Sequence, residues 1–153
     1  ETIKIIGNLP YYIASPIIIK LLKYYKWRSM LFMVQKEVGD RIIAGYGNKD
    51  YGRLSVMSQV FSSPIRKMDV SRNVFFPRPK VDSSMILFKP RPSIPIDKFD
   101  KFSEFIKLAF RHRRKKIKNN LTCYYKNGLL GELSDLRPEQ ISPKQYINLF
   151  GSK

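Results

Sequence analysis

The chain has 153 residues, which suits one domain or a domain with an appendage, and its hydrophobic content of 43% is sufficient for a packed core. It contains no apolar run long enough to span a membrane and no recognisable signal peptide. Its single cysteine, Cys123, excludes an internal disulfide, which fits the reducing cytoplasm. Cys123 and His112 are too few for a structural metal site, so we predict no metal ion. The lone cysteine leads us to expect a cytoplasmic location. We also expect a monomer.

The net charge of +17, from 29 Lys and Arg against 12 Asp and Glu, is the most unusual property of the chain. A charge of this size could simply keep the surface solvated. The basic residues are, however, interleaved with 9 Tyr, 10 Phe and one Trp, a mixture that serves phosphate contact and base stacking. No segment is uninterrupted enough to form an obvious amphipathic helix at a membrane surface. The composition therefore favours nucleic acid over membrane as the partner.

The first element is the apolar run 3–7, which predicts a short buried strand that ends before Pro10. It leads into Asn8-Leu9-Pro10-Tyr11, at the carboxyl end of the strand, where open α/β sheets bind ligands. The Asn8 side-chain oxygen and a backbone carbonyl at Leu9 or Pro10 could accept the two N–H groups of a nucleobase amine, and Tyr11 could stack on the base. Alternatively, Asn8 bonds its own backbone and only closes a turn.

Ser15 and Pro16 are typical of a helix start, with Ser15 as the N-cap, and predict a helix over 16–25. The pattern then predicts, in order, a buried strand over 29–35, a helix over 36–44, a polar loop over 45–52, a helix over 53–61, and strands over 64–70 and 83–89. In the last strand, Met85 and Leu87 face one side and Ile86 and Phe88 the other.

Two loops in the first 91 residues each come after a predicted strand. Gln35-Lys36-Glu37 either lines the site, because it comes directly after a strand, or is a solvated helix start in which Glu37 favours the helix N-terminus. Between 74 and 79, two prolines one residue apart predict a stiff, extended loop. We expect Phe76 of this loop to be buried in the core.

Beyond three prolines at 90, 92 and 95 the pattern becomes helical, with an apolar stripe from Phe102 to Phe110. Seven basic residues lie between Lys107 and Lys118 with no acid among them, and we expect a second or continued helix there that ends near Gly128 and Gly131. Ser142-Pro143-Lys144-Gln145 has the form of a capping box and predicts a last helix that stops at Gly151.

Five stretches in this order carry a resemblance to a known family. They are Asn8-Leu9-Pro10-Tyr11; Gln35-Lys36-Glu37-Val38; Tyr51-Gly52-Arg53-Leu54-Ser55-Val56; Phe75-Phe76-Pro77-Arg78-Pro79-Lys80-Val81-Asp82-Ser83; and Arg113-Arg114-Lys115 with Asn119-Asn120-Leu121. Together they resemble the ribosomal RNA small-subunit adenine dimethyltransferases, which use S-adenosylmethionine. The Gly-rich cofactor loop of these enzymes is missing here. The resemblance therefore implies an α/β fold class: the second half of a Rossmann-like class I methyltransferase sheet, strands 4–7, followed by a small all-helical domain.

The resemblance also implies a division of the chain and its sites. Residues 1–91 would be the C-terminal half of the catalytic domain, 92–98 a linker and 99–153 an rRNA-binding domain. Asn8, Leu9, Pro10 and Tyr11 would be catalytic, with Phe75 packing over the target base and Asn8 also contacting the cofactor. The substrate would be two adjacent adenosines near the 3′ end of small-subunit rRNA, with a role in small-subunit biogenesis. We expect these residues alone to be inactive.

The basic helix would supply phosphate contacts from Arg111, Arg114, Lys115 and Lys118. Arg113 has two possible roles. It falls near the apolar stripe at helical spacing, so it either contacts RNA or pins the helical domain to the sheet domain.

Two other functions remain open. The erythromycin-resistance methylases, which act on large-subunit rRNA, more often have Ile in place of Leu9 and Asp in place of Pro16; DNA adenine methylases lack the basic helix. A non-catalytic rRNA-binding assembly factor is the alternative from another class. Tyr12 and Ala14 depart from the commoner Asn and Thr or Ser of the family, which concerns local hydrogen bonding but not Asn8.

Overall fold

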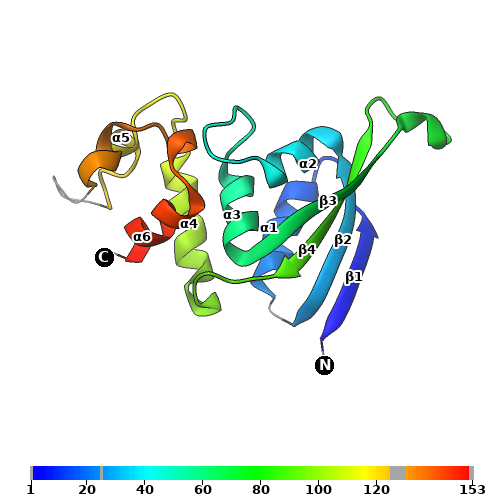
Figure 1. Cartoon of the computed structure of the whole chain (residues 1–153), viewed down its shortest axis with the longest axis horizontal. Coiled ribbons are helices and arrows are strands. Elements are labelled where there is room, and N and C mark those ends of the chain that lie inside the picture. The colour runs from blue at the N-terminus through cyan, green and yellow to red at the C-terminus, as the bar shows by residue number, and fades with distance from the viewer. Residues whose placement is uncertain (1, 25, 125–129, 152–153) are drawn as a thin grey trace.

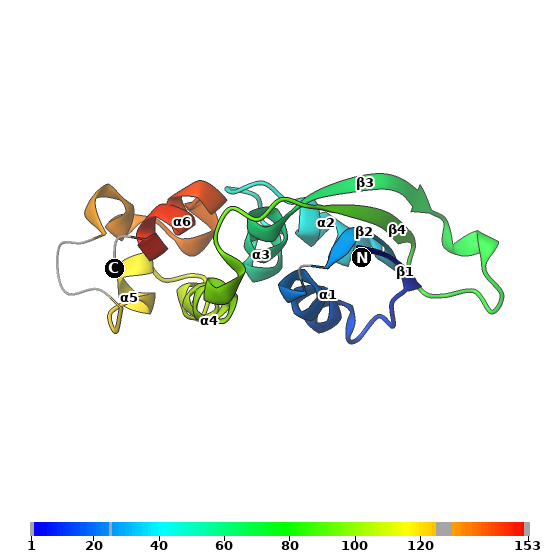
Figure 2. The ribbon, with the colours of Figure 1, turned by 90° about the horizontal axis from the view of Figure 1, so that it is seen from below.

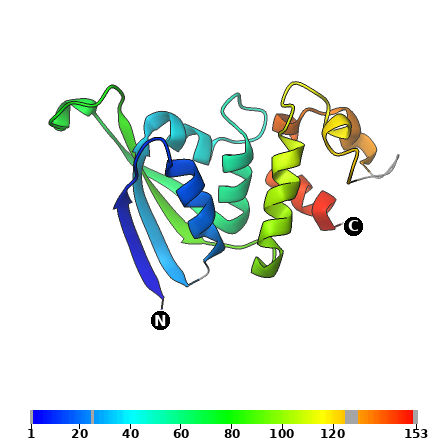
Figure 3. The same cartoon turned by 180° about the vertical axis from the view of Figure 1, so that it is seen from behind.

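The computed structural model describes residues 2–24, 26–124 and 130–151. The molecule is elongated, with a β-sheet at one end and a group of short helices at the other (Figure 1). The N-terminus lies at the sheet and the C-terminus at the helices (Figure 3). A loop after strand β3 and the helix α5 mark the two ends of the long axis (Figure 2).

Four strands form the sheet in the order β1-β2-β4-β3. Their bounds are β1 Ile3–Asn8, β2 Trp27–Gln35, β3 Ser62–Val70 and β4 Ser83–Pro90. The first pair, β1 and β2, is parallel, whereas β4 is antiparallel to both β2 and β3. All four predicted strands are present, although β2 and β3 each begin two residues earlier than predicted. The prediction that the first strand is buried is wrong, because β1 is an edge strand with no buried residue and Ile6 is exposed.

Three helices pack on one face of this sheet: α1 Ala14–Lys23, α2 Lys36–Ile43 and α3 Arg53–Phe61. The prediction that Ser15 caps α1 is wrong, because α1 begins at Ala14 after Ile13 and has no side-chain cap. The chain is already turning there, since the Ile13 N–H donates to the Pro10 carbonyl at 3.2 Å. Pro16 therefore lies inside the first turn, where a missing N–H costs nothing. The predicted end at Tyr25 falls outside the described residues.

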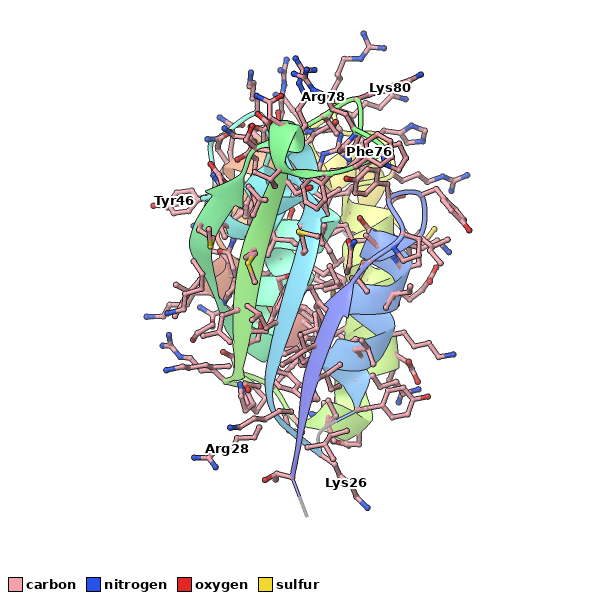
Figure 4. All side chains as sticks on the ribbon, turned by 90° about the vertical axis from the view of Figure 1, so that its right-hand side faces the viewer. Lys26, Arg28, Tyr46, Phe76, Arg78 and Lys80 are labelled. Carbon is pink, nitrogen blue, oxygen red and sulfur yellow. The ribbon has the colours of Figure 1, made fainter. Side chains whose placement is uncertain are left out.

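The two faces of the sheet differ. The face toward the helices carries Met30, Phe32 and Val34 of β2 and Ile86 and Phe88 of β4, all buried. The opposite face, which we call the open face, is covered by no described element (Figure 4). Strand pairing aligns two rows on it: Ile6, Leu31, Leu87 and Ile65, and then Asn8, Met33, Met85 and Met68. Ile6 is 77% and Met68 54% exposed.

The helical part contains α4 Phe99–Ala109, α5 Ile117–Asn120 and α6 Pro143–Gly151, with 3-10 turns at Ile96–Lys98, Gly131–Asp135 and Pro138–Gln140. The predicted capping box is confirmed, since Gln145 N–H donates to Ser142 Oγ and Ser142 N–H donates to Gln145 Oε1. One apolar core runs through both parts, and the ring centroids of Phe61 on α3 and Phe99 on α4 lie 4.5 Å apart. No helix in the described ranges is long and apolar enough to cross a membrane.

The expected basic helix does not form. Helix α4 ends at Ala109, and residues 110–116 are turns. Asn120 explains the stop, because its side-chain amide donates to the Ala109 carbonyl at 2.8 Å and to the His112 carbonyl at 3.1 Å. The Ala109 carbonyl is one of the orphan carbonyls that a helix end must satisfy, and the His112 carbonyl belongs to the turn that follows. Ile117 then returns fully buried to the core, and α5 ends long before Gly131; Gly128 lies outside the described residues.

Candidate functional site

The turn after β1 presents an unused amide. Leu9 N–H donates to the Met33 carbonyl at 3.0 Å, which extends the β1–β2 ladder one residue beyond Asn8, and the Leu9 side chain is buried. The Asn8 side chain is exposed on the open face and has no hydrogen bond within the described part of the chain. The structure thus does not support the alternative in which Asn8 bonds its own backbone.

Asn8, Leu9, Pro10 and Tyr11 together line a hollow of about 330 Å³. The Pro10 carbonyl already accepts the Ile13 N–H. The Leu9 carbonyl has no such bond among the described residues, so of the two carbonyls considered for the single backbone acceptor beside Asn8 it is the unoccupied one. Tyr11 is half-buried, and its hydroxyl lies 3.4 Å from Ser83 Oγ at the start of β4.

A second hollow of about 520 Å³ lies at the same carboxyl edge of the sheet. Its lining comes from Gln35, Lys36, Glu37 and Asp40 on one side and Arg72, Lys80, Val81 and Asp82 on the other. It shares no lining residue with the Asn8 turn. Lys36 pairs with Asp69 at 3.4 Å, and Glu37 pairs with Arg41. A hydrogen bond from Ser84, with help from Arg66 and Lys36, lowers the pKa of Asp69. Gln35, Lys36 and Glu37 therefore neighbour the turn without joining it.

Phe75 lines neither hollow and is half-buried in the loop between β3 and β4. The expectation that Phe76 belongs to the core is wrong, because its side chain is fully exposed (102%). This loop projects past the end of the sheet, where no described element packs against it (Figure 1). Pro77 and Pro79 predict a stiff loop, but they do not indicate whether Phe75 or Phe76 faces outward.

Three of the four predicted RNA-binding residues are free cations. Arg111, Arg114 and Lys115 are exposed in the turns of 110–116, and their side chains make no hydrogen bond or ion pair with other described residues. The fourth, Lys118 of α5, pairs with Asp135 at 2.8 Å, and Lys116 pairs with the same carboxylate at 3.0 Å. Sequence analysis missed this acid because it lies 17 residues beyond Lys118.

Arg113 ties the two parts of the molecule together. Its Nη2 donates to the carbonyl of Lys49 in the 45–52 loop, and its Nε lies 4.0 Å from Glu139 Oε2. The same region holds a buried hydrogen bond from the Tyr51 hydroxyl to the Ile141 carbonyl at 2.9 Å. Burial raises the pKa of Tyr51, which keeps that hydroxyl protonated as a donor. Of the two roles left open for Arg113, the structure supports the pinning role.

The turn can hold a group that carries two N–H donors, because it presents two acceptors at one strand end. In the described ranges no group of three or more His, Cys, Asp or Glu side chains could hold a metal ion. The carboxyl ends of β1 and β2, the loop after β3 and the turns of 110–116 lie along one long edge of the molecule, uppermost in Figures 1 and 3.

The family model for "Ribosomal RNA adenine dimethylase" matches residues 1–150. The chain belongs to this family. A ribosomal RNA small subunit methyltransferase A of Malacoplasma penetrans is 39% identical, with 95% of this chain and 56% of that protein covered. The protein of the same name from Ehrlichia ruminantium is also 39% identical, over 96% of this chain and 59% of its own length. The chain thus spans little more than half of these dimethylase-family relatives.

Solved structures confirm the fold. A dimethyladenosine transferase from Plasmodium falciparum superposes with a TM-score of 0.87 at 21% identity, over 99% of this chain and 66% of the other. The 23S rRNA methyltransferase ErmE gives a TM-score of 0.73 at 23% identity, over 99% of this chain and 65% of the other. The fold of this dimethylase-family chain is therefore that of a Rossmann-like methyltransferase, from its fourth strand onward, followed by helices.

Proposed function

We propose that this chain is the C-terminal part of an rRNA adenine N6-dimethyltransferase. Its substrates would be two adjacent adenosines near the 3′ end of small-subunit rRNA, and its role would be in small-subunit biogenesis, which in turn agrees with a cytoplasmic location. Residues 1–91 would complete the catalytic domain and 99–153 would bind rRNA, joined by 92–98. The observation that carries the proposal is the exposed, unbonded amide of Asn8 at the carboxyl end of a parallel strand in a chain of this family.

The amine of adenine is a poor nucleophile because its lone pair is delocalised into the ring. The Asn8 side-chain oxygen and the Leu9 carbonyl would each accept one of its N–H groups, which favours a pyramidal nitrogen with its lone pair directed away from the turn. The target base would first leave its stack, at a cost of a few kcal/mol, and Tyr11 and Phe75 would contact its faces. Most of the rate enhancement would come from this positioning and from fixed dipoles, without a strong general base.

The cofactor would be S-adenosylmethionine, which supplies an electrophilic methyl group when bound. Of the described residues, those of the Asn8 turn would lie beside it, since Asn8 has a free amide in an open hollow. The rest of its site would come from a further part of the whole protein. The open face and the unpaired edge of β1 support such a part, because an exposed apolar surface rimmed by polar residues is typical of an interface.

The RNA would run along the edge of the molecule that holds the Asn8 turn. Arg111, Arg114 and Lys115 would contact its phosphates, since their charges are unpaired. Lys118 would contribute less, because Asp135 already neutralises it in part. Contacts of this kind read shape and backbone rather than sequence, as is usual for A-form RNA.

The test of catalysis is Asn8→Ala in the whole protein. We expect methyl transfer to fall at least about 100-fold, as for the loss of one positioned polar group in other active sites. Affinity for RNA should stay within about twofold, since the turn carries no charge. Asn48→Ala is the matched control, because Asn48 lies in the distant 45–52 loop, and it should keep normal turnover. Wild-type turnover from Asn8→Ala would remove Asn8 from the mechanism and assign catalysis to other residues of the whole protein.

Charge reversal tests the RNA surface. Arg114→Glu with Lys115→Glu should weaken RNA binding. The negative slope of log affinity against log salt should become shallower, by about 0.7 to 0.9 for each lost contact. Lys26→Glu with Arg28→Glu changes the net charge equally at the opposite end of the sheet (Figure 4). That control should leave the slope nearly unchanged. Equal effects of the two pairs would show that only the total charge matters.

A further inference from the structure

The loop of residues 71–82 extends beyond the sheet between β3 and β4. It forms the tip of the molecule opposite the helical part (Figures 1 and 2). Its two ends are fastened to each other. Arg72 N–H donates to Asp82 Oδ1 at 3.0 Å, and Arg72 Nη1 donates to the Lys80 carbonyl at 2.9 Å. The loop therefore has a defined shape before any partner binds, which reduces the entropy lost on binding.

This loop exposes an aromatic ring among cations. Phe76 is fully exposed (102%) and Val74 is 70% exposed. Arg78 and Lys80 are exposed as well, and their side-chain charges have no hydrogen-bond or ion-pair partner in the described ranges. Figure 4 shows Phe76, Arg78 and Lys80 together at one end of the sheet. Exposure of apolar side chains to water is unfavourable, and Phe76 and Val74 are exposed together, so this part of the loop is suited to contact with a partner.

The base of the loop lies beside the candidate active site. Ser83, the first residue after the loop, is buried and lies 3.4 Å from the Tyr11 hydroxyl. Arg72, Lys80, Val81 and Asp82 line the hollow that adjoins the carboxyl end of β2. A strand of RNA that places one nucleotide at Asn8 would therefore have its neighbouring nucleotides within the reach of the loop.

We propose that loop 71–82 binds a single-stranded segment of the RNA substrate next to the target adenosine. Phe76 stacks on an unpaired base, and Arg78 and Lys80 contact the flanking phosphates. Stacking is tolerant of sequence because every base has a flat face, and it combines with phosphate contacts in single-strand binding sites. This inference rests on the proposed function and adds to it a residue that positions the substrate outside the Asn8 turn.

The experiment measures binding of the whole protein to a short single-stranded RNA that carries 2-aminopurine beside the target adenosine. Phe76→Ala should weaken binding about tenfold and abolish the fluorescence quenching that stacking causes. Phe76→Trp should restore both. Tyr46→Ala is the matched control, because Tyr46 is an exposed aromatic residue of another loop, 61% exposed, and it should change neither. Arg78→Gln with Lys80→Gln should make the dependence of affinity on salt concentration shallower and should leave the fluorescence quenching unchanged.

Three results would overturn the inference. Binding and quenching by Phe76→Ala within twofold of wild type would show that the ring does not touch RNA. A lower melting temperature with unchanged affinity would show that Phe76 packs against another part of the whole protein. Loss of binding to vesicles of anionic phosphatidylglycerol, with RNA binding intact, would assign the loop to a membrane. Absence of RNA binding by the wild-type protein would instead refute the proposed function, so the two failures are distinguishable.

Discussion

The two faces of the sheet are built from the same kinds of residue but have different surroundings. On β4, Ile86 and Phe88 are fully buried under the helices, whereas Met85 and Leu87, which alternate with them, are only partly buried. On β2 the run Leu31-Phe32-Met33-Val34 is apolar at every position. Strands with apolar residues on both sides are typical of sheets covered on both faces. The comparison teaches that apolar residues on both sides of a strand predict a sheet covered on both faces, even in a chain whose described residues cover only one face.

Neighbouring residues of β4 give the sharpest contrast. Phe88→Ala should lower the free energy of unfolding by about 3–5 kcal/mol, because it removes a ring from a packed core. Leu87→Ala should cost less than about 1 kcal/mol, since its side chain already contacts water. Urea unfolding of both variants of the 153-residue chain measures the difference. If Phe88→Ala does not fold, Phe88→Leu, with an expected loss of about 1.5 kcal/mol or less, replaces it. Equal costs at the two positions would show that Leu87 is as well packed as Phe88 and that this face of the sheet is not open.

The Leu87→Ala variant of the whole protein tests whether the open face is covered there. If a further layer covers the open face there, the variant should cost about 2–4 kcal/mol, as for other buried leucines. Denaturant unfolding of the whole protein and of this chain, each with and without the substitution, gives the test. A cost that does not rise with chain length would leave the open face exposed in both and remove the support it gives to the proposed cofactor-binding part.

A larger residue in place of Gly39 tests how closely α2 packs on the covered face of the sheet. A Cβ placed on Gly39 of α2 would lie 2.9 Å from Ser84 Cβ on β4, closer than side chains approach each other. Gly39→Ala should gain about 1 kcal/mol in helix propensity but lose more to the clash, for a net loss of about 1–2 kcal/mol. Gly45→Ala has no neighbour within 4 Å and is the control. A melting temperature raised by Gly39→Ala would mean that α2 leaves room for a methyl group between Gly39 and Ser84.

The smallest expected effect lies away from both faces, at an exposed carboxylate. Hydrogen bonds from Lys118 and Lys116 lower the pKa of Asp135 from 3.8 to about 2. Its contribution to stability is therefore present above pH 3.8 and is lost as the pH falls toward 2. NMR titration should show this pKa, and Lys118→Met should raise it toward 3.8. A pKa unchanged by Lys118→Met would show that the ion pair does not persist in solution.

Most of the fold could be predicted from the sequence. Alternation along β4 assigned Met85 and Leu87 to one face and Ile86 and Phe88 to the other, as the structure confirms. Local chemistry also predicted the cap of α6 at Ser142. The start of α1 was missed because the turn at Pro10–Ile13 depends on a backbone hydrogen bond that leaves no residue signature.

The site was less predictable than the fold. The Asn8 turn follows from a strand and a proline, both local signals. The basic run after Ala109 misled because helical spacing continues through it, whereas the stop depends on Asn120, eleven residues further along. Phe75 and Phe76 are adjacent and chemically identical, so only the path of the loop decides which ring faces water. Long-range contacts of this kind are absent from any periodic pattern.

The two margins of the sheet have an unequal tendency toward self-association. The outer margin at β3 carries Pro64, Lys67 and a bulge between Arg66 and Met68, features that prevent another strand from adding. The margin at β1 has no proline. Lys4 and an irregularity of register between Ile3 and Lys4 are its only such features, and it presents Ile3 and Ile6 along an unpaired edge. Concentrated solutions of this chain should therefore aggregate through β1. A further Lys, in place of Ile3 or Ile6, should reduce this aggregation.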